Sequence, residues 1–313
     1  MGWNGSLTAS SEVGAVITFT PDTSTEGGYT VSSFVAPKKG IYRFQLYGSG
    51  GTKGYLDGTT YVGAGGQGGY TDGYLLLEKD QTIYVGAGGT CSAAFVSSAT
   101  VTKLSAISKS SLYFVAGAGG GGGAAIDNEY GTGWNCCYVA GGIGGGTSGG
   151  TSQLDYFIGG TGGSQTSGGT AGGESGNLGG NGAYGVGGTA GIRYDWGNYV
   201  GKGGRGGDGY YGGGGGHGFA YYDDSLEVGG GRGYGGGGGS GYVKTASLTV
   251  GDKTYTSTTV SGSGSASNTK GKVIVTYYAR TELPVVFNGT TLEKIIFNGV
   301  EITSLIYNGT KLF

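Results

Sequence analysis

The run Gly117-Ala-Gly-Gly-Gly-Gly-Gly123 decides what kind of fold this chain can adopt, because it offers almost no side chains from which to build a core. Further runs follow at 144–146, 212–216 and 235–239. Glycine makes up 81 of the 313 residues, and it loses more conformational entropy on folding than any other residue. Ordinary hydrophobic burial therefore cannot hold residues 117–241 together.

Polyproline-II geometry offers these runs another way to become ordered. This helix has three residues per turn, rises about 3.1 Å per residue and points every backbone N–H and C=O outward. Glycine strands of this kind can lie close enough to hydrogen-bond one another, which would pair the buried backbone. We expect residues 117–241 to form such a polyglycine-II bundle, because aromatic clusters interrupt the runs. The alternative is a flexible linker, although linkers are usually Gly/Ser without aromatic residues.

The sequence on both sides of the glycine-rich block has the pattern of short β-strands. In residues 41–47, Tyr42, Phe44 and Leu46 alternate with Arg43 and Gln45, as a half-buried strand requires. Similar β-branched or aromatic runs occur at 13–20, 29–35, 73–77, 82–85, 112–116, 242–250, 254–260 and 272–278. We expect an antiparallel β-sandwich that the block interrupts. Residues 97–110 could form a helix, although Ser and Thr are frequent in them.

The carboxyl-terminal residues repeat a ten-residue unit. Phe287-Asn-Gly, Phe297-Asn-Gly and Tyr307-Asn-Gly each stand between apolar runs, and Asn-Gly in that setting is the strongest short-range signal for a β-hairpin. The expected organisation has four parts. They are N-terminal sandwich strands at 1–116, the inserted block at 117–241, closing sandwich strands at 242–282 and β-hairpin repeats at 283–313.

Composition excludes several classes of protein. Three prolines exclude collagen, and 12% aromatic against 12% charged residues argues against disorder. The 18 Lys and Arg are slightly outnumbered by the 20 Asp and Glu, so we expect no nucleic-acid partner and interpret the Arg-containing piece at 202–208 as structural. No apolar run approaches the roughly 18 residues of a membrane helix, and we expect no membrane insertion. Whether Cys136 and Cys137 are oxidised stays open.

No group of residues has the pattern of a catalytic or metal site. His217 is the single histidine, so a histidine cluster is impossible and a catalytic triad would rest on this residue alone. Asp223 with Asp224, or Glu227 with Asp208, could act as paired carboxylates, but glycine-rich surroundings offer no pocket to tune them. We interpret His217 as a loop residue and these acids as solvated. We expect no enzyme activity, no cofactor and no metal.

Four aromatic segments interrupt the glycine runs, at 128–138, 153–158, 192–200 and 217–227. If they are the turns between glycine helices, their side chains gather at the bundle ends beside Asn, Asp and Gly, a composition typical of binding loops. The candidate receptor-binding residues are Tyr130, Trp134, Tyr138, Tyr156, Phe157, Tyr194, Trp196, Tyr199, Phe219, Tyr221 and Tyr222. The alternative is that these side chains fold back and cap the bundle.

The order of a strand at 40–47, a strand at 74–77, Thr82-Ile-Tyr-Val-Gly86, a long glycine block and a closing strand at 271–276 carries a resemblance. It is similar to the glycine-rich, TNF-like region of the anaplastic lymphoma kinase and leukocyte tyrosine kinase receptors. The resemblance covers about residues 30–280 and implies a mainly β fold, a TNF-like or jelly-roll-type β-sandwich with an inserted bundle of polyglycine-II helices. These residues hold no kinase sequence, so the receptors' function does not carry over.

The glycine block with its aromatic interruptions also resembles the tip adhesins of T-even-like phage long tail fibres, and the Asn-Gly repeats resemble those that end many phage structural proteins. These resemblances imply a tail-associated bacteriophage adhesin whose aromatic loops bind a host cell-surface protein or glycan. They imply other virion proteins and further copies of the chain, a homotrimer being favoured, as partners. They place the protein in the virion, extracellular after host lysis. The alternative is a structural head or tail decoration protein without receptor binding.

Overall fold

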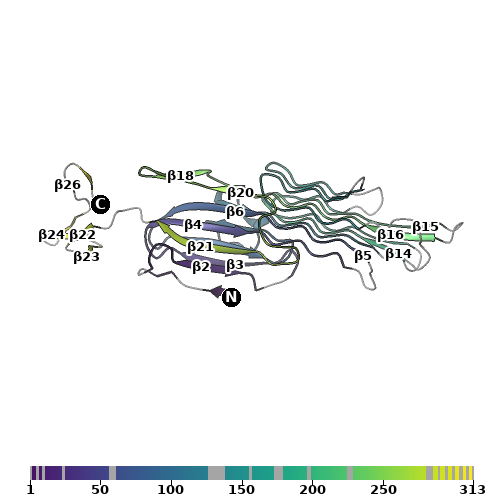
Figure 1. Cartoon of the computed structure of the whole chain (residues 1–313), viewed down its shortest axis with the longest axis horizontal. Helices are drawn as coiled ribbons and strands as arrows, with labels where there is room; N and C mark the ends of the chain where they lie inside the picture. Colours follow the sequence, from purple (N-terminus) through teal and green to yellow (C-terminus); the bar gives the residue numbers. More distant parts are fainter. Residues whose placement is uncertain are drawn as a thin grey trace.

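The computed structural model consists of antiparallel sheets and almost no helix (Figure 1). This confirms the expectation of a mainly β chain. The structure describes residues 2–4, 7–8, 11–22, 25–55, 61–125, 138–154, 157–172, 179–195, 199–223 and 228–279, together with six short strands between residues 285 and 311.

Two antiparallel sheets form the central part of the molecule. The six-stranded sheet has the order β1 (Gly2–Asn4), β2 (Val16–Thr20), β21 (Lys272–Ala279), β4 (Gly40–Tyr47), β6 (Tyr70–Leu77) and β20 (Thr258–Val260). The five-stranded sheet has the order β17 (Tyr242–Val243), β9 (Leu112–Ala116), β8 (Ala94–Ser97), β7 (Thr82–Gly88) and β3 (Tyr29–Val35). A two-stranded sheet of β18 (Ser247–Val250) and β19 (Lys253–Thr256) lies near β6. The arrangement is consistent with a β-sandwich.

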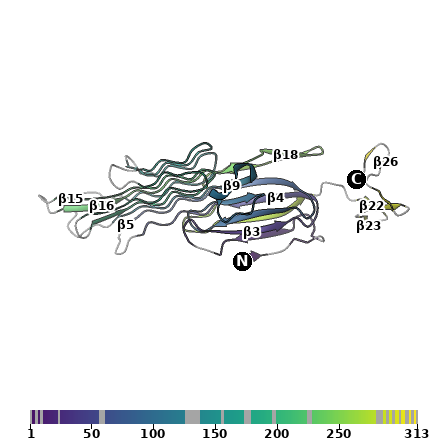
Figure 2. The ribbon, with the colours of Figure 1, turned by 180° about the vertical axis from the view of Figure 1, so that it is seen from behind.

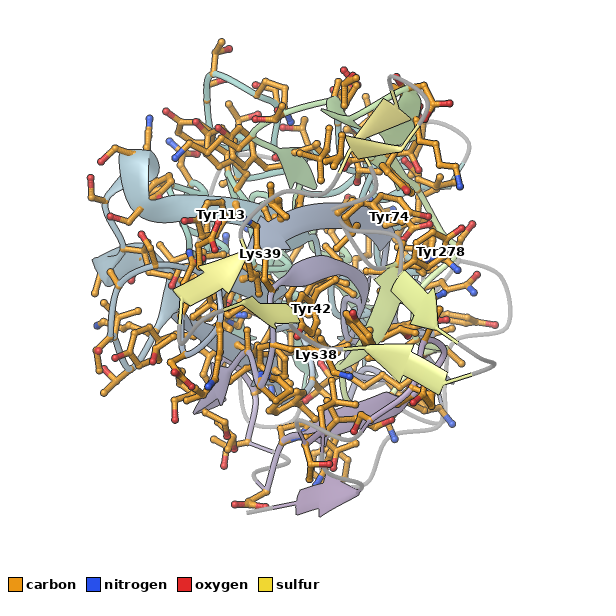
Figure 3. The ribbon with its side chains drawn as sticks, turned by 90° about the vertical axis from the view of Figure 1, so that its left-hand side faces the viewer. Lys38, Lys39, Tyr42, Tyr74, Tyr113 and Tyr278 are labelled. Atoms are coloured by element: carbon orange, nitrogen blue, oxygen red, sulfur yellow. The ribbon has the colours of Figure 1, made fainter. Side chains whose placement is uncertain are left out.

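Apolar side chains from both sheets make the core. β4 buries Tyr42, Phe44 and Leu46, while Arg43 and Gln45 stay partly exposed, so the alternation predicted for this strand is confirmed. The other sheet and the closing strand contribute Ile83, Val85, Phe114, Val273, Val275 and Tyr277. Figure 3 shows this end of the molecule, with Tyr42 in the middle and Tyr74 beside Tyr278 at one side. Burial of each large side chain contributes roughly 1.5–3 kcal/mol.

The helix considered for residues 97–110 is wrong. The first of them, Ser97, ends β8, and the helical residues among them are confined to the 3₁₀ turn η1 (Leu104–Ala106) and the start of the 3₁₀ turn η2 (Lys109–Ser111). Serine side chains bond locally instead, as when the Ser97 hydroxyl donates to the Ala99 carbonyl. Such bonds compete with helix formation. Leu104 and Ile107 nevertheless pack in a second apolar cluster with Phe95 and Val115 of the five-stranded sheet.

The glycine-rich block leaves the sandwich after β9 and returns in β17. These two strands are antiparallel neighbours, with Tyr242 opposite Val115, so the chain exits and re-enters at adjacent places. Between them, long extended segments run side by side away from the sandwich (Figures 1 and 2). The short strands between them are β10 (Ala124–Ala125), β11 (Gln153–Leu154), β12 (Phe157–Ile158), β13 (Ile192–Asp195), β14 (Tyr199–Lys202), β15 (Gly218–Asp223) and β16 (Val228–Gly233). The connection from β4 to β6, with the short strand β5 (Tyr61–Val62), runs beside these segments and is hydrogen-bonded to them.

Backbone hydrogen bonds join these segments, and the bonded partner changes with a period of three residues. Residues 117–123 show this period. The N–H groups of residues 118 and 121 donate to the segment 203–208, and those of residues 119 and 122 donate to the segment 48–54. The N–H groups of residues 120 and 123 donate to the segment 139–145. Carbonyl groups of residues 117–123 accept hydrogen bonds from N–H groups of the segments 63–69 and 234–239. Residues 212–217 bond six segments, at 159–161, 169–172, 179–183, 188–191, 203–208 and 234–239. An ordinary sheet strand has only two neighbours.

Six short strands near the carboxyl end pair two by two. The antiparallel pairs are β22 (Val285–Phe287) with β23 (Thr290–Leu292), β24 (Ile295–Phe297) with β25 (Val300–Ile302), and β26 (Ile306–Tyr307) with β27 (Thr310–Lys311). The Asn-Gly residues that separate the two strands of each pair lie outside the described residues.

Two adjacent glycines test whether close backbone approach holds the block together. A Cβ at Gly120 would lie 2.0 Å from the Gly236 carbonyl oxygen, whereas a Cβ at Gly121 would first meet the Thr52 hydroxyl at 2.9 Å. We therefore expect Gly120→Ala to lower the free energy of unfolding by about 3 kcal/mol or more, and Gly121→Ala by about 1 kcal/mol. Urea unfolding of both variants measures this. An equal loss of unfolding free energy in the two variants would mean that the close spacing of the segments does not determine which glycines can be replaced.

Candidate functional site

The strands β13, β14 and β15, which carry predicted aromatic residues, lie together at the end of the glycine-rich block farthest from the sandwich. Figures 1 and 2 both place β5, β15 and β16 at this far end, and Figure 1 shows β14 there as well. β13, β14, β10 and β5 form one four-stranded sheet, and β14 also contacts both strands of the β15–β16 pair. The glycine segments position these strands, because each strand continues a segment whose backbone is bonded to its neighbours.

Seven of the eleven predicted receptor-binding residues belong to the described part of the chain. Tyr138 makes an isolated parallel bridge with Gly233 of β16. The other six lie in strands, namely Phe157 in β12, Tyr194 in β13, Tyr199 in β14, and Phe219, Tyr221 and Tyr222 in β15. Tyr130, Trp134, Tyr156 and Trp196 lie outside the described residues.

Register shows which of these positions are close to one another. Tyr199 stands opposite Asp195 across the β13–β14 pair, and Phe219 stands opposite Arg232 across β15 and β16. The Arg193 guanidinium lies 5.6 Å from the centre of the Phe219 ring, a cation–π contact between β13 and β15. Phe219 is partly buried, so this residue both joins two strand pairs and reaches the surface.

Other exposed apolar side chains at the far end were missed by the sequence analysis. Tyr55 is 67% exposed, Ile158 52% and Ile192 36%, against 42% for the predicted Tyr138. A signal for Tyr55 was present, because it follows the glycine-rich residues 48–54 just as the predicted aromatics follow the later runs. Exposed apolar side chains that cluster on one surface are typical of interaction sites.

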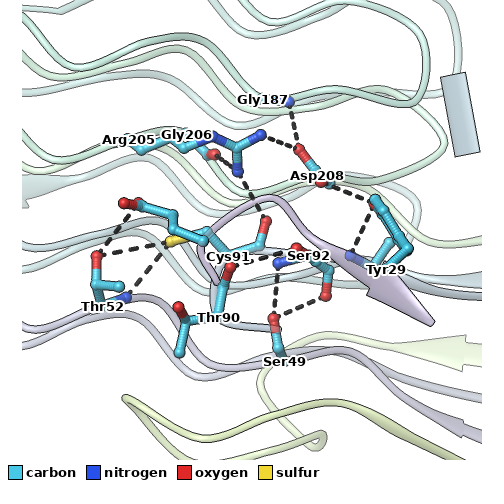
Figure 4. A network of polar contacts seen from close by, with 12 residues as sticks. Tyr29, Ser49, Thr52, Thr90, Cys91, Ser92, Gly187, Arg205, Gly206 and Asp208 are labelled. Atoms are coloured by element: carbon cyan, nitrogen blue, oxygen red, sulfur yellow. Dashed lines mark hydrogen bonds and ion pairs between the residues drawn. The ribbon is translucent and has the colours of Figure 1, made fainter. Parts of the chain in front are cut away.

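A buried polar network joins the glycine-rich block to the sandwich (Figure 4). The Asp208 carboxylate accepts hydrogen bonds from the Tyr29 hydroxyl at 2.7 Å, from the Gly187 N–H at 2.8 Å and from the Arg205 guanidinium at 2.6 Å. Arg205 also donates to the Cys91 carbonyl at 3.1 Å. Asp208 is 1% exposed, so its interpretation as a solvated acid is wrong. Long-range packing against Tyr29 buries it, and an ion pair with Arg205 offsets the cost of burial.

A tyrosine cluster forms a second contact between the two parts. The rings of Tyr210 and Tyr242 stack with centres 4.2 Å apart, and Tyr184 meets Tyr210 edge to face at 5.7 Å. Lys109 of η2 donates a hydrogen bond of 2.6 Å to the Tyr211 hydroxyl. Burial raises the pKa of Tyr184 to about 12. These tyrosines lie at the sandwich end of the block, so they belong to its attachment rather than to the far-end surface.

Two further residues differ from the exposed environment that a glycine-rich loop suggests. His217 is fully buried, with its ring 6.0 Å from the ring of Tyr234 and 6.3 Å from that of Phe219, so it is part of the packed block and not an open loop residue. Cys91 is a buried free thiol, and burial raises its pKa to about 12. A thiol with so high a pKa is a poor nucleophile at neutral pH.

No protein-family model matches the sequence, and no curated protein is significantly similar to it. Among the described residues, no helix is long and apolar enough to span a membrane. Nor does this part of the chain group three or more His, Cys, Asp or Glu side chains as a metal site would require.

Asp208→Asn tests the buried network. The substitution leaves the Arg205 charge buried without its counter-charge, and we expect it to lower the free energy of unfolding by about 3 kcal/mol or more. The matched control is Glu78→Gln, which removes the exposed ion pair with Lys39 at 3.3 Å and is expected to cost less than about 1 kcal/mol. Urea unfolding at neutral pH compares the two. A small loss in Asp208→Asn would show that the network contributes little to stability.

Stability is expected to fall in alkali. Burial raises the pKa of Tyr29 well above 10, and raises the pKa of Tyr42, Tyr74 and Tyr184 to about 12. The unfolded chain therefore releases these protons at lower pH than the folded chain does, and the free energy of unfolding declines once the pH passes about 10. Burial also raises the pKa of the Cys91 thiol, which in the unfolded chain ionises near pH 9, so the decline in the free energy of unfolding begins at about pH 9. Urea unfolding between pH 8 and 11 measures it, and a flat profile would contradict the expectation.

Proposed function

We propose that this chain is a receptor-binding protein of a bacteriophage tail, which binds a host cell-surface protein or glycan through the far end of its glycine-rich block. The observation that carries the proposal is the gathering of strands from separate aromatic segments at that end, away from the sandwich. Tyr55, Tyr138, Ile158 and Ile192 add exposed apolar area there. Tyrosine suits such a surface because it offers wide contact at a low entropic cost.

We also propose that the glycine segments are polyglycine-II helices inserted in a TNF-like or jelly-roll-type sandwich. The period of three in their hydrogen-bond partners supports this, because polyglycine-II turns once in three residues. The adjacency of β9 and β17 supports an insertion spanning residues 117–241, with closing strands at 242–282. The paired strands between 285 and 311 support hairpin repeats in residues 283–313.

In this proposal the two ends of the protein have different roles. The sandwich and the hairpin repeats attach the chain to other virion proteins or to further copies, a homotrimer being favoured, and the aromatic end projects toward the host. The rigidity of the block supports the division, because segments bonded to five or six neighbours hold their ends at fixed positions. No cofactor or reaction is part of the proposed role.

Substitution of the aromatic segments tests receptor binding. We expect the combined variant Trp134→Ala, Trp196→Ala and Tyr221→Ala to slow host adsorption more than about tenfold, because aromatic anchors contribute about 2 kcal/mol or more each at interfaces. Val35→Ala, which changes an exposed side chain of the sandwich, is the control and should adsorb normally. Adsorption is counted as free infectious particles over time, with peptide mass spectrometry of density-purified particles to show that both variants are incorporated.

Unchanged adsorption with normal incorporation would contradict the adhesin proposal. Electron microscopy of the particles then distinguishes the structural alternative, in which the aromatic end is covered by a neighbouring subunit. Absence of the chain from purified particles would exclude both roles.

A further inference from the structure

Among the described residues, the ring of segments around residues 117–123 is incomplete. Its members are 48–54, 63–69, 139–145, 234–239 and 203–208, and in this order each is hydrogen-bonded to the next. No bond between described residues closes the ring from 203–208 back to 48–54. Residues 212–217, by contrast, have all six neighbours. The sixth position around 117–123 is therefore a gap between the 48–54 and 203–208 segments.

Near the sandwich, one residue of another part of the chain fills this gap. The Cys91 N–H donates to the Gly50 carbonyl at 3.0 Å, and the Cys91 carbonyl accepts from the Asp208 N–H at 2.8 Å. Cys91 lies in the connection between β7 and β8, and Figure 4 shows it between the two segments. The gap thus accepts the N–H and C=O groups of a peptide backbone at its inner end.

Farther from the sandwich the same backbone groups recur, and no described residue takes the place of Cys91 beside them. The carbonyl of Lys53 lies three residues after the carbonyl of Gly50 in the segment 48–54. In the segment 203–208, the N–H of Arg205 lies three residues before the N–H of Asp208. Backbone groups three residues apart in one segment point to the same neighbour. The Lys53 carbonyl and the Arg205 N–H therefore point into the gap, as the corresponding groups of Gly50 and Asp208 do. Neither they nor the Gly122 carbonyl bonds the backbone of any described residue. All three residues line a hollow of about 310 Å³.

We propose that this hollow binds an extended, glycine-rich peptide segment of a partner protein, which completes the sixth position. A peptide backbone supplies both kinds of group that are needed, N–H donors for the Gly122 and Lys53 carbonyls and a carbonyl for the Arg205 N–H. The Cys91 peptide groups show this chemistry one turn away. The inference rests on the hydrogen-bond pattern and does not depend on the adhesin role.

The segments at the edge of the block indicate which peptide fits. Residues 159–164 read Gly-Gly-Thr-Gly-Gly-Ser, and Gly160 and Gly163 donate to the 234–239 segment. None of the four glycines has room for a Cβ beside the neighbouring backbone, while Thr161 and Ser164 stay partly exposed. An occupant of the hollow is expected to have the same pattern, with glycine at the two inward positions of each turn and a larger residue at the outward one. Tyr55, Lys53 and Lys202 line the hollow and can contact that outward residue.

The test titrates the full-length ¹⁵N-labelled chain with the capped peptide acetyl-Gly-Gly-Thr-Gly-Gly-Ser-amide and follows backbone amides by NMR. We expect saturable shifts of the Arg205 amide, and of the Gly54 and Gly123 amides that follow the Lys53 and Gly122 carbonyls, with a dissociation constant of about 1 mM. The same peptide with alanine in place of every glycine should shift none of them. This second probe needs no variant of the protein.

Two variants locate the site. Ala190 lines the hollow, and Ala190→Trp should fill it and reduce the Arg205 shift more than tenfold. Thr189→Trp, at the exposed neighbouring position outside the hollow, should leave the shift unchanged. No Arg205 shift at about 10 mM peptide, an equal shift in Ala190→Trp, or a shift with maltohexaose but not with the peptide would overturn the proposal.

Discussion

Backbone hydrogen bonds between glycine segments are the interaction on which the rest of this molecule depends. A segment such as 117–123 has no side chains to bury, so its N–H and C=O groups must find partners in the surrounding segments. Each bond contributes only about 0.5–1.5 kcal/mol, but a buried group without a partner costs about 1–3 kcal/mol. The demand for partners in several directions sets the spacing of the segments, and that spacing leaves no room for a Cβ at Gly120. The positions of the strands at the far end follow from this packing.

The sandwich supplies what the glycine-rich block lacks. Its core buries large side chains between two sheets, and its strands β9 and β17 hold the two ends of the block side by side. The attachment is reinforced by the Asp208–Arg205 ion pair, which reaches Tyr29, and by the stacking of Tyr210 on Tyr242. Charged and aromatic groups thus concentrate where the two kinds of packing meet. At the same junction Cys91 of the sandwich contributes one residue to the block's hydrogen-bond pattern, and the ring around residues 117–123 is open only beyond it.

Local pattern predicted the strands well and the environment of single polar residues poorly. Alternation in β4 was sufficient because a strand presents every second residue to one face. Residues 97–110 were harder, since apolar Leu104 and Ile107 would suit a helix while the surrounding serines bond locally and leave only 3₁₀ turns. Glycine-rich surroundings predict a solvated Asp208 and a loop position for His217, but both side chains are buried. The burial of Asp208 depends on Tyr29, which lies 179 residues away in sequence, and the ring of His217 lies beside the rings of Tyr234 and Phe219. Composition carries no information about such neighbours.

By itself the sequence determined that this chain has two kinds of packing, since apolar alternation flanks a block that has almost no side chains to bury. It also determined that aromatic residues are confined to the breaks between glycine runs. Only the tertiary structure decided that strands from several of these breaks meet at one end, that Tyr55 belongs with them, and that the sixth place beside residues 117–123 is left open beyond Cys91. The physical reason is that glycine segments are nearly identical in sequence. Which segment lies next to which is set by their connections, their lengths and the few side chains at their ends.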